Sequence, residues 1–168
     1  MLLSHDTEVG PVTLAATAAG LAICSFDEFG SIRRRHPATG AESGSPHLDL
    51  ARRELDEYFA GRLREFTVPL DLCLAEPFDR TVLNGLSAVR YGSTMTYGGL
   101  AERLGLPRTA ARAVGRAMAL NPVLIIVPCH RIVGSDGALV GYAGGLSIKR
   151  RLLDLETADQ IPQLDLTW

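Results

Sequence analysis

The chain has 168 residues, of which 46% are hydrophobic and 21% charged, and its formal net charge at pH 7 is −2. These proportions are ordinary for a folded globular protein, so they exclude a disordered or low-complexity chain. The small net charge by itself gives no indication of nucleic-acid binding.

The N-terminal part of the chain begins with a predicted β-hairpin. The short segments Val12-Thr13-Leu14 and Leu21-Ala22-Ile23 flank Ala18-Ala19-Gly20, which places a glycine at the turn. Residues 30–46 then hold several glycines and prolines together with three consecutive arginines, Arg33-Arg34-Arg35. We expect an exposed loop there, in which solvated arginines are a simpler interpretation than arginines that contact phosphate.

A helix and a further strand complete this first unit. Hydrophobic residues recur at helical spacing over residues 48–59, and Gly61 provides a helix end. Residues 65–73 contain alternating apolar side chains, which predicts a half-buried strand. The order strand, strand, helix, strand predicts an α/β domain over residues 1–76.

The second unit, residues 77–168, is predicted to be mainly helical. Apolar spacing indicates one helix over residues 78–89. Thr96 can cap a short helix that ends near Leu104, because its hydroxyl accepts a hydrogen bond from a free amide of the first turn. A further helix over residues 108–120 ends before a proline.

The last two of these helices, joined by a turn that contains Gly105, form a helix-turn-helix candidate. Arg108, Arg112 and Arg116 are four residues apart and therefore share one face of the second helix. Small residues such as Ala111 keep this helix thin enough to approach another surface closely. An arginine stripe facing solvent in an ordinary helical bundle explains the same pattern equally well.

The charge distribution bears on the same question. Residues 1–77 carry 7 basic and 12 acidic side chains, whereas residues 78–156 carry 10 basic and 5 acidic ones. A basic half beside an acidic half is expected where one half meets a polyanion, although chance placement on a solvated face is an equal alternative.

An aliphatic run at residues 123–127 lies between two prolines and predicts a short buried strand. Directly behind it stand Pro128, Cys129, His130 and Arg131. A thiol is a good nucleophile only as the thiolate, which a neighbouring imidazole or cation favours. Pro128 allows the chain to leave strand geometry, so that Cys129 and His130 can cooperate. By itself, however, a cysteine behind an aliphatic run is more often inert core.

The end of the chain combines a turn, a glycine-rich segment and a helix. Residues 135–137 predict the turn, and residues 141–145 provide backbone that can pass close to a flat ligand. No G-x-x-x-x-G-K-[ST] or G-x-G-x-x-G motif is present, so a phosphate-binding loop is not predicted. Residues 146–156 show helical spacing, with Lys149 expected on the outer face.

Cysteine usage and hydropathy restrict the compartment. Cys24, Cys73 and Cys129 are an odd number and far apart, which does not fit a disulfide framework and indicates a reducing compartment. Without C-x-x-C or H-x-x-x-H spacing we expect no metal. The uncharged stretch 9–26 is interrupted by glycine and proline, so it fits neither a membrane span nor a signal peptide. We expect a cytoplasmic protein.

Together these pieces resemble the O6-alkylguanine-DNA alkyltransferase family, most specifically in the block at residues 128–131. The further matching positions are Phe78, Val82, Tyr91-Gly92, Thr96-Tyr97, Leu100-Ala101, Ala111-Arg112-Ala113-Val114-Gly115, Asn121-Pro122, Ile126-Val127, Gly141-Tyr142, Gly144-Gly145, Lys149, Leu152-Leu153 and Glu156. The first unit resembles the family's ribonuclease-H-like domain more weakly. The implied fold is an α/β ribonuclease-H-like domain followed by a mainly α domain with a winged-helix-like helix-turn-helix.

The resemblance implies direct-reversal DNA repair, in which Cys129 attacks the alkyl carbon of O6-alkylguanine, with O4-alkylthymine as a further substrate class. The protein would bind double-stranded DNA from the minor groove and rotate the damaged base out of the stack, with Arg112 filling the gap. Each chain would act once as a methyltransferase and would need no cofactor, because the alkyl group comes from the base. We expect a monomer with no membrane partner, and cooperativity on DNA is left open.

The resemblance also implies roles for single residues. His130 would be the base for Cys129, acting through a water, and Glu156 would orient the imidazole. Tyr97 would donate a proton to guanine N3, and Asn121 would hold the turn before the cysteine. The expected DNA-contacting residues are Thr96, Arg108, Ala111, Arg112 and Arg116.

The same resemblance predicts a base-binding pocket. The carbonyl groups of Cys129 and Ile132 would accept from the guanine amino group, and Tyr142 would form a wall. Ala143 and Gly144 would line the pocket, and the amide of Ala143 would donate to the guanine oxygen. Many family members have serine at the position of Ala143, so a hydroxyl is missing here, and alkyl groups larger than methyl could fit.

Three other functions fit parts of the pattern. A lesion binder of the same fold would flip alkylguanine without a cysteine, and Cys129 argues against it. A helix-turn-helix regulator with an inert thiol would have no need of Tyr97, Asn121, His130 and Glu156 in register with the family. A cysteine hydrolase is not indicated, because no known Cys-His-Asn spacing occurs.

Overall fold

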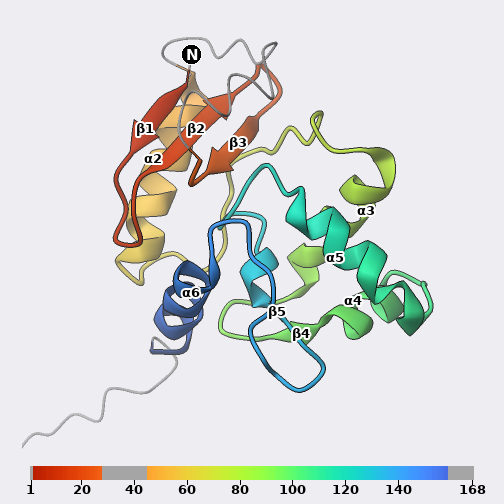
Figure 1. Ribbon diagram of the computed structural model, residues 1–168. Coiled ribbons are helices and arrows are strands. Elements are labelled where there is room, and N and C mark those ends of the chain that lie inside the picture. The colour runs from red at the N-terminus through yellow and green to blue at the C-terminus, as the bar shows by residue number, and fades with distance from the viewer. Residues whose placement is uncertain (1, 28–44, 159–168) are drawn as a thin grey trace, which may run out of the picture.

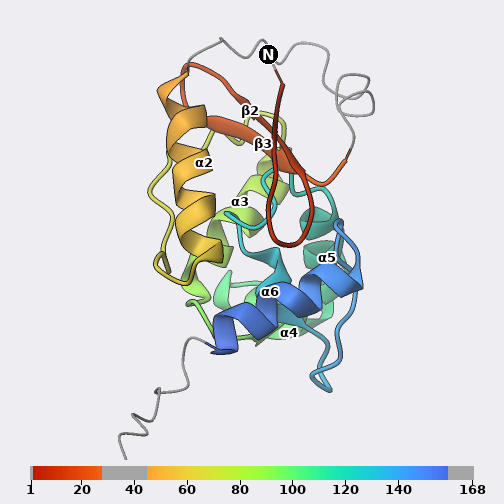
Figure 2. The same ribbon diagram turned by 90° about the vertical axis from the view of Figure 1, so that its left-hand side faces the viewer.

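A three-stranded antiparallel sheet opens the computed structural model, which describes residues 2–27 and 45–158. The strands follow chain order as β1 (Leu3–His5), β2 (Val12–Ala16) and β3 (Leu21–Ser25). Helix α2 (Pro46–Phe59) packs across one face of this sheet, as Figure 1 and Figure 2 show. The predicted hairpin and the first predicted helix are therefore confirmed. Most of the predicted loop at 30–46 lies outside the described residues.

The predicted strand at residues 65–73 is wrong. Only Leu70 forms a bridge, to Leu21 of β3. The Glu54 carboxylate of α2 instead accepts hydrogen bonds from the hydroxyl of Thr67 and, at 3.0 Å, from its amide. The Glu54 side chain thus takes the place of a neighbouring strand as the hydrogen-bond partner of this backbone amide. The segment therefore stays irregular.

The rest of the molecule is mainly helical. Its elements are α3 (Pro77–Gly85), η1 (Leu86–Ala88), β4 (Met95–Thr96), α4 (Tyr97–Arg103), η2 (Arg108–Ala110), α5 (Ala111–Ala119), η3 (Cys129–Arg131), β5 (Ile132–Val133) and α6 (Leu146–Ala158), the η elements being short 3-10 helices. Helices α4 and α5 pack together as the predicted helix-turn-helix, and α3 covers α5 (Figure 1). Thr96 caps α4 as predicted, because its hydroxyl accepts from Gly99 N at 3.0 Å. Strands β4 and β5 pair in parallel, which was not predicted.

The predicted strand at residues 123–127 is also wrong in geometry, although the expected burial is correct. Val123 alone forms a bridge, to Cys24, and the chain then turns, with the amide of Val127 donating to the Val123 carbonyl at 3.0 Å. Ile125 adopts φ 72°, a left-handed conformation that β-branched residues rarely take. An aliphatic run predicts burial, but a buried turn meets that requirement as well as a strand does.

The larger of the hydrophobic clusters among the described residues spans both parts of the molecule. Strand β3 reaches the turn before η3, because Cys24 N donates to Pro122 O at 2.9 Å and Leu124 N donates to Cys24 O at 2.7 Å. The sheet therefore helps to fix the segment that carries Cys129. Among the helices in the described ranges, none is both long and apolar enough to cross a membrane.

Candidate active site

Cys129 opens the short helix η3 directly after Pro128, and only 6% of the residue is exposed. Its sulfur lies 3.2 Å from the side-chain amide nitrogen of Asn121, which donates to it. The same nitrogen donates to Val127 O at 3.1 Å, while the Asn121 side-chain oxygen accepts from Val123 N at 3.0 Å. These backbone bonds fix the orientation of the amide, so that an N–H group points at the sulfur.

The electrostatic surroundings of the thiol differ from those predicted. Burial raises the pKa of Cys129 to about 11, against the lowering effects of the Asn121 hydrogen bond and the Lys149 charge. The resting group is therefore a thiol that must be deprotonated during reaction. Arg131, expected as a cation beside the sulfur, is not among the groups that shift the pKa of Cys129 and donates instead to Val89 O at 2.7 Å.

A buried carboxylate organises the other half of the site. Glu156 on α6 accepts from His130 Nε2 at 2.8 Å, from Arg131 at 2.9 to 3.2 Å and from Gly92 N at 3.0 Å. Its Oε1 atom also accepts from the Tyr58 hydroxyl at 2.8 Å. The sequence indicated the His130–Glu156 pair, but gave no signal for Tyr58, which lies 98 residues away on α2.

The protonation states of this pair follow from the contacts. Burial raises the pKa of Glu156, but the hydrogen bonds and charges of His130 and Arg131 outweigh burial and hold it at about 2. An ionised carboxylate can only accept, so the proton of His130 resides on Nε2 and leaves Nδ1 with a free lone pair. Burial lowers the pKa of His130, and Nδ1 has no hydrogen-bond partner among the described residues. The imidazole is therefore a neutral base with an unused acceptor.

Lys149 corrects a further expectation, because it is fully buried instead of lying on the outer face of its helix. Its Nζ atom donates to Ile132 O at 2.6 Å, to Val140 O at 2.8 Å and to Gly141 O at 3.2 Å. Three carbonyl groups thus replace water around the ammonium group. A signal was present in the sequence, since Lys149 shares the inner stripe of α6 with Leu152 and Glu156.

A cavity of about 180 Å³ lies beside the sulfur. Cys129, Tyr97, Tyr142 and Ala143 line it, as predicted, together with Gly115 and other residues of α5 and the 141–143 segment. The Tyr97 hydroxyl donates to Val140 O at 2.9 Å.

Two predicted pocket residues lie outside the lining of this cavity. Ile132 is fully buried, and its carbonyl group is already bonded to Lys149. Gly144 lies against Phe26, so closely that an added Cβ would be 2.6 Å from that ring. A larger residue at this position would therefore have to displace the ring of Phe26 or of Tyr142.

A larger groove of about 590 Å³ runs along the helix-turn-helix and shares Tyr97, Gly115 and Gly141 with the cavity. Four of the five predicted DNA-contacting residues line the groove, namely Thr96, Arg108, Ala111 and Arg112. The fifth, Arg116, is exposed on α5 but does not line it.

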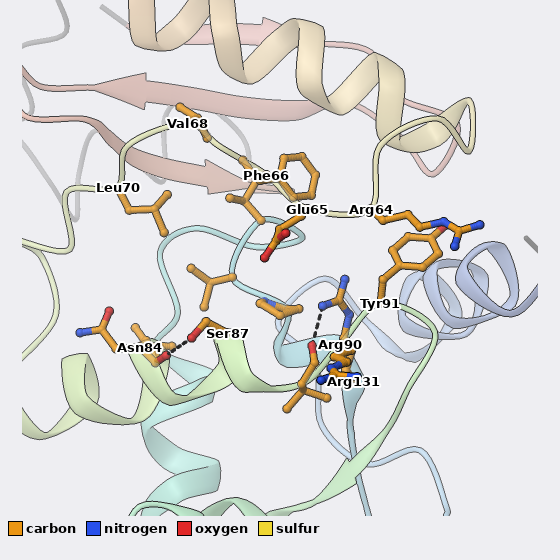
Figure 3. A pocket seen from close by; sticks show the side chains of 15 residues that line it. Arg64, Glu65, Phe66, Val68, Leu70, Asn84, Ser87, Arg90, Tyr91 and Arg131 are labelled. Carbon is orange, nitrogen blue, oxygen red and sulfur yellow. Dashed lines mark hydrogen bonds between the residues drawn. The ribbon is translucent and has the colours of Figure 1, made fainter. Parts of the chain in front are cut away.

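A separate cavity of about 590 Å³ lies between segment 64–70 and the helices α3 and η1 (Figure 3). Tyr91 stands in its wall, with the guanidinium carbon of Arg64 at 5.8 Å and that of Arg131 at 5.7 Å from the ring centre. Within residues 2–27 and 45–158, no cluster of three or more His, Cys, Asp or Glu side chains could hold a metal ion.

Comparison with known families gives two matches. Residues 4–72 match the model described as "6-O-methylguanine DNA methyltransferase, ribonuclease-like domain", and residues 77–158 match that family's "DNA binding domain". These matches confirm the predicted fold, with a ribonuclease-like part before a part that contains the helix-turn-helix.

Curated relatives point the same way. The methylated-DNA–protein-cysteine methyltransferase of Mycobacterium bovis is 44% identical over 154 residues, covering 90% of this chain and 88% of the relative. The protein of the same name from Methanosarcina acetivorans is 42% identical over 151 residues, covering 90% and 94%.

Solved structures are similar over nearly the whole chain. The Mycobacterium tuberculosis O6-methylguanine methyltransferase superposes with a TM-score of 0.81 at 38% identity, covering 97% of this chain and 96% of that one. The crystal structure of the Mycobacterium tuberculosis protein in complex with DNA gives a TM-score of 0.78, also at 38% identity, with coverages of 93% and 92%.

Proposed function

Because the chain belongs to the 6-O-methylguanine DNA methyltransferase family, as its resemblance predicted, we propose that it repairs O6-alkylguanine in double-stranded DNA by transferring the alkyl group to Cys129. The observation that carries this proposal is the cavity beside the sulfur, which shares residues with the groove along the helix-turn-helix. At about 180 Å³ it is smaller than the roughly 300–1,000 Å³ typical of drug-sized ligands, which suits a single extruded base.

DNA would lie along α5, whose exposed face carries Arg112 and Arg116. Small residues on this face, Ala111 among them, allow the helix to approach the floor of the minor groove. Arg112 would occupy the space in the stack that the flipped base leaves. Thr96 and Arg108 would contact the backbone at the edge of the groove.

The transfer step needs a route for one proton. A water between the Cys129 sulfur and His130 Nδ1 would carry the thiol proton to the imidazole, and Glu156 would stabilise the imidazolium. The S–C bond then forms as the C–O6 bond breaks, and the bonding electron pair leaves with the guanine. Tyr97 would release Val140 O, donate its hydroxyl proton to guanine N3 and recover a proton from solvent.

The remaining site residues would position the base. Backbone carbonyl groups of Cys129 and Ile132 would accept from the guanine amino group, since a carbonyl oxygen has a second lone pair even where Lys149 already uses one. Tyr142 would shape the wall, Gly144 would leave room for the rings of Tyr142 and Phe26, and Asn121 would hold the turn and the thiol. The product thioether is stable, so each chain would react once.

Substrate range would depend on the small residue Ala143. Without a hydroxyl at this position, the space beside Cys129 could admit an alkyl group larger than methyl, and O4-alkylthymine would present a similar alkyl carbon. Comparing transfer rates for O6-methylguanine and O6-benzylguanine duplexes tests this, and complete refusal of the benzyl adduct would contradict it.

We also propose domain limits of 1–76 and 77–168, in line with the start of α3 at Pro77. The protein would act as a monomer in the cytoplasm, where a reducing environment keeps Cys24, Cys73 and Cys129 free.

One experiment tests the central proposal. Excess duplex containing O6-methylguanine is mixed with the protein, and the peptide that contains Cys129 is weighed by mass spectrometry. We expect one added methyl group on this cysteine, saturating at one per chain. The Cys129→Ala variant should bind the lesion duplex without being methylated. Tight binding by an unmodified wild-type protein would instead indicate a lesion binder.

A further inference from the structure

One side chain connects the N-terminal part of the molecule to the base of the proposed reaction. Tyr58 lies near the end of α2 and is fully buried. Its hydroxyl donates at 2.8 Å to Glu156 Oε1, the same atom that accepts from His130 Nε2 at 2.8 Å. In both Figure 1 and Figure 2 the C-terminal end of α2 lies near α6.

The phenol is held in this position from several sides. The ring centre of Tyr58 lies 5.2 Å from Phe59, 5.3 Å from Phe66 and 5.9 Å from Tyr91. Burial and the neighbouring Glu156 charge raise the pKa of Tyr58 far above its ordinary value. The hydroxyl therefore stays protonated and remains a donor to Glu156 over the whole working pH range.

We propose that Tyr58 is a positioning residue for alkyl transfer, acting through Glu156 on His130. This inference rests on the proposed function and assigns the ribonuclease-like part a task in the chemistry. The hydroxyl holds Oε1 in line with the imidazole. It also competes with His130 for the negative charge on that oxygen, and so limits how strongly the carboxylate attracts an imidazole proton.

The expected sign follows from this competition. The charged groups around His130 are Glu156 and Lys149 from α6 and Arg131 from η3. The neutral residues near it include Cys129 and the ring of Tyr142, whose centre is 6.4 Å away. In Tyr58→Phe none of these charges changes, but Oε1 loses one donor and attracts the imidazole proton more strongly. His130 should then bind its proton at higher pH and act as a poorer acceptor near neutrality.

The test is the single-turnover rate of methyl transfer from an O6-methylguanine duplex, measured from about pH 5 to about pH 9. For Tyr58→Phe we expect the acidic limb of the profile to move up by about one pH unit, so that the rate at a pH well below this limb falls about tenfold. Lesion binding should stay within about twofold of the wild type. Phe59→Leu is the matched control, because it disturbs the same aromatic cluster without touching Glu156, and its acidic limb should not move.

A second measurement keeps the inference testable if Tyr58→Phe does not fold. Placing 3-fluorotyrosine at position 58 preserves the ring and makes the hydroxyl a stronger donor, so the acidic limb should move down. The imidazole resonance of His130, followed by NMR, should titrate in the same direction as the rate. The inference would be overturned if the acidic limb of the rate profile stays in place both in Tyr58→Phe and in the 3-fluorotyrosine protein. It would also be overturned if the limb moves equally in Phe59→Leu. If wild-type Cys129 accepts no methyl group, the proposed function fails, whereas the NMR titration still reports on the Tyr58 link.

Discussion

At the Cys129 sulfur, the structure provides one amide donor and one nearby positive charge, which is too little to ionise the thiol at rest. With a pKa of about 11, roughly one thiol in 10,000 is ionised at pH 7. We expect the rate of Cys129 alkylation by iodoacetamide to rise about tenfold per pH unit between about pH 7 and about pH 10. The measurement belongs in a Cys73→Ala background, because Cys73 is exposed. A plateau below about pH 9 would contradict the raised pKa.

Lys149 provides a second prediction at this scale. In Lys149→Met, the carbonyl groups of Ile132, Val140 and Gly141 lose their shared donor and the thiol loses its nearby cation. We expect unfolding free energy to fall by about 1–3 kcal/mol and iodoacetamide to react more slowly with Cys129 at a given pH.

Urea unfolding and thiol alkylation measure these two effects of Lys149→Met. Arg150→Met is the matched control, because Arg150 is the next residue of α6 and is exposed. Equal losses in both variants would mean that the buried ammonium group has no special role.

The residue types of the site could be predicted from the sequence, but their partners could be predicted only in part. Cys129, His130 and Glu156 were predicted as site residues from the family resemblance, which is most specific in the block at residues 128–131. The bond from Arg131 to Val89, and the bond from Tyr58, could not be predicted from the motif. Both depend on contacts between segments far apart in the chain, which neither periodicity nor neighbouring residues report.

At the scale of the elements, helices were predicted well because apolar spacing encodes both their presence and their buried face. The two strand predictions failed for a common reason. In segment 65–73 the carboxylate of Glu54 satisfies the backbone, and in segment 123–127 a local turn does so. Apolar residues report burial, whereas the choice between strand and turn depends on where the backbone hydrogen bonds are made.

The helix-turn-helix gives the prediction that belongs to this scale. Arg112 and Arg116 are exposed and form no ion pair within the described part of the chain, whereas Arg108 lies 2.9 Å from the Glu102 carboxylate. The association constant K for duplex DNA falls as the salt concentration rises. Arg112→Ala and Arg116→Ala should each reduce the magnitude of the slope of log K against log salt concentration by about 1. Arg108→Ala should lower it less, because Glu102 already neutralises that side chain.

Binding titrations over a series of salt concentrations measure these slopes. Arg53→Ala is a suitable control, because Arg53 is exposed on α2, outside the groove. If Arg53→Ala changes the slope as much as Arg112→Ala does, the α5 arginines do not contact DNA more than other exposed arginines do.

At the scale of the whole molecule, the two parts meet through a shared core and through a few directed bonds near the site. Strand β3 bonds to the turn before η3, and α2 sends Tyr58 to Glu156. The sequence predicted two units in the correct order but not this connection, because the contacting residues are separated by about a hundred positions. The carboxylate of Glu156 is bonded to residues of α2, η3 and the segment before β4, and it belongs to α6 itself. Its ionisation therefore affects the stability of the entire fold.

Acid should therefore destabilise the protein through Glu156. Its folded pKa of about 2 lies below the ordinary value of 4.5, so the stabilisation is complete above about pH 4.5 and is lost as the pH falls towards 2. The full loss is on the order of 3 kcal/mol. Burial lowers the pKa of His130, which likewise reduces stability on acidification. Urea unfolding between about pH 6 and about pH 3 should show a steep decline for the wild type.

Glu156→Gln should be less stable than the wild type at pH 6 by about 3–5 kcal/mol, because Arg131 then lies buried without its carboxylate. Its stability should decline less between about pH 4.5 and about pH 3, since the titrating group is absent. Glu57→Gln is the control, because the Glu57–Arg62 pair is exposed and screened by solvent, and it should follow the wild-type curve. If Glu156→Gln keeps the full wild-type acid dependence, the carboxylate that joins the two parts is not the group that acid titrates.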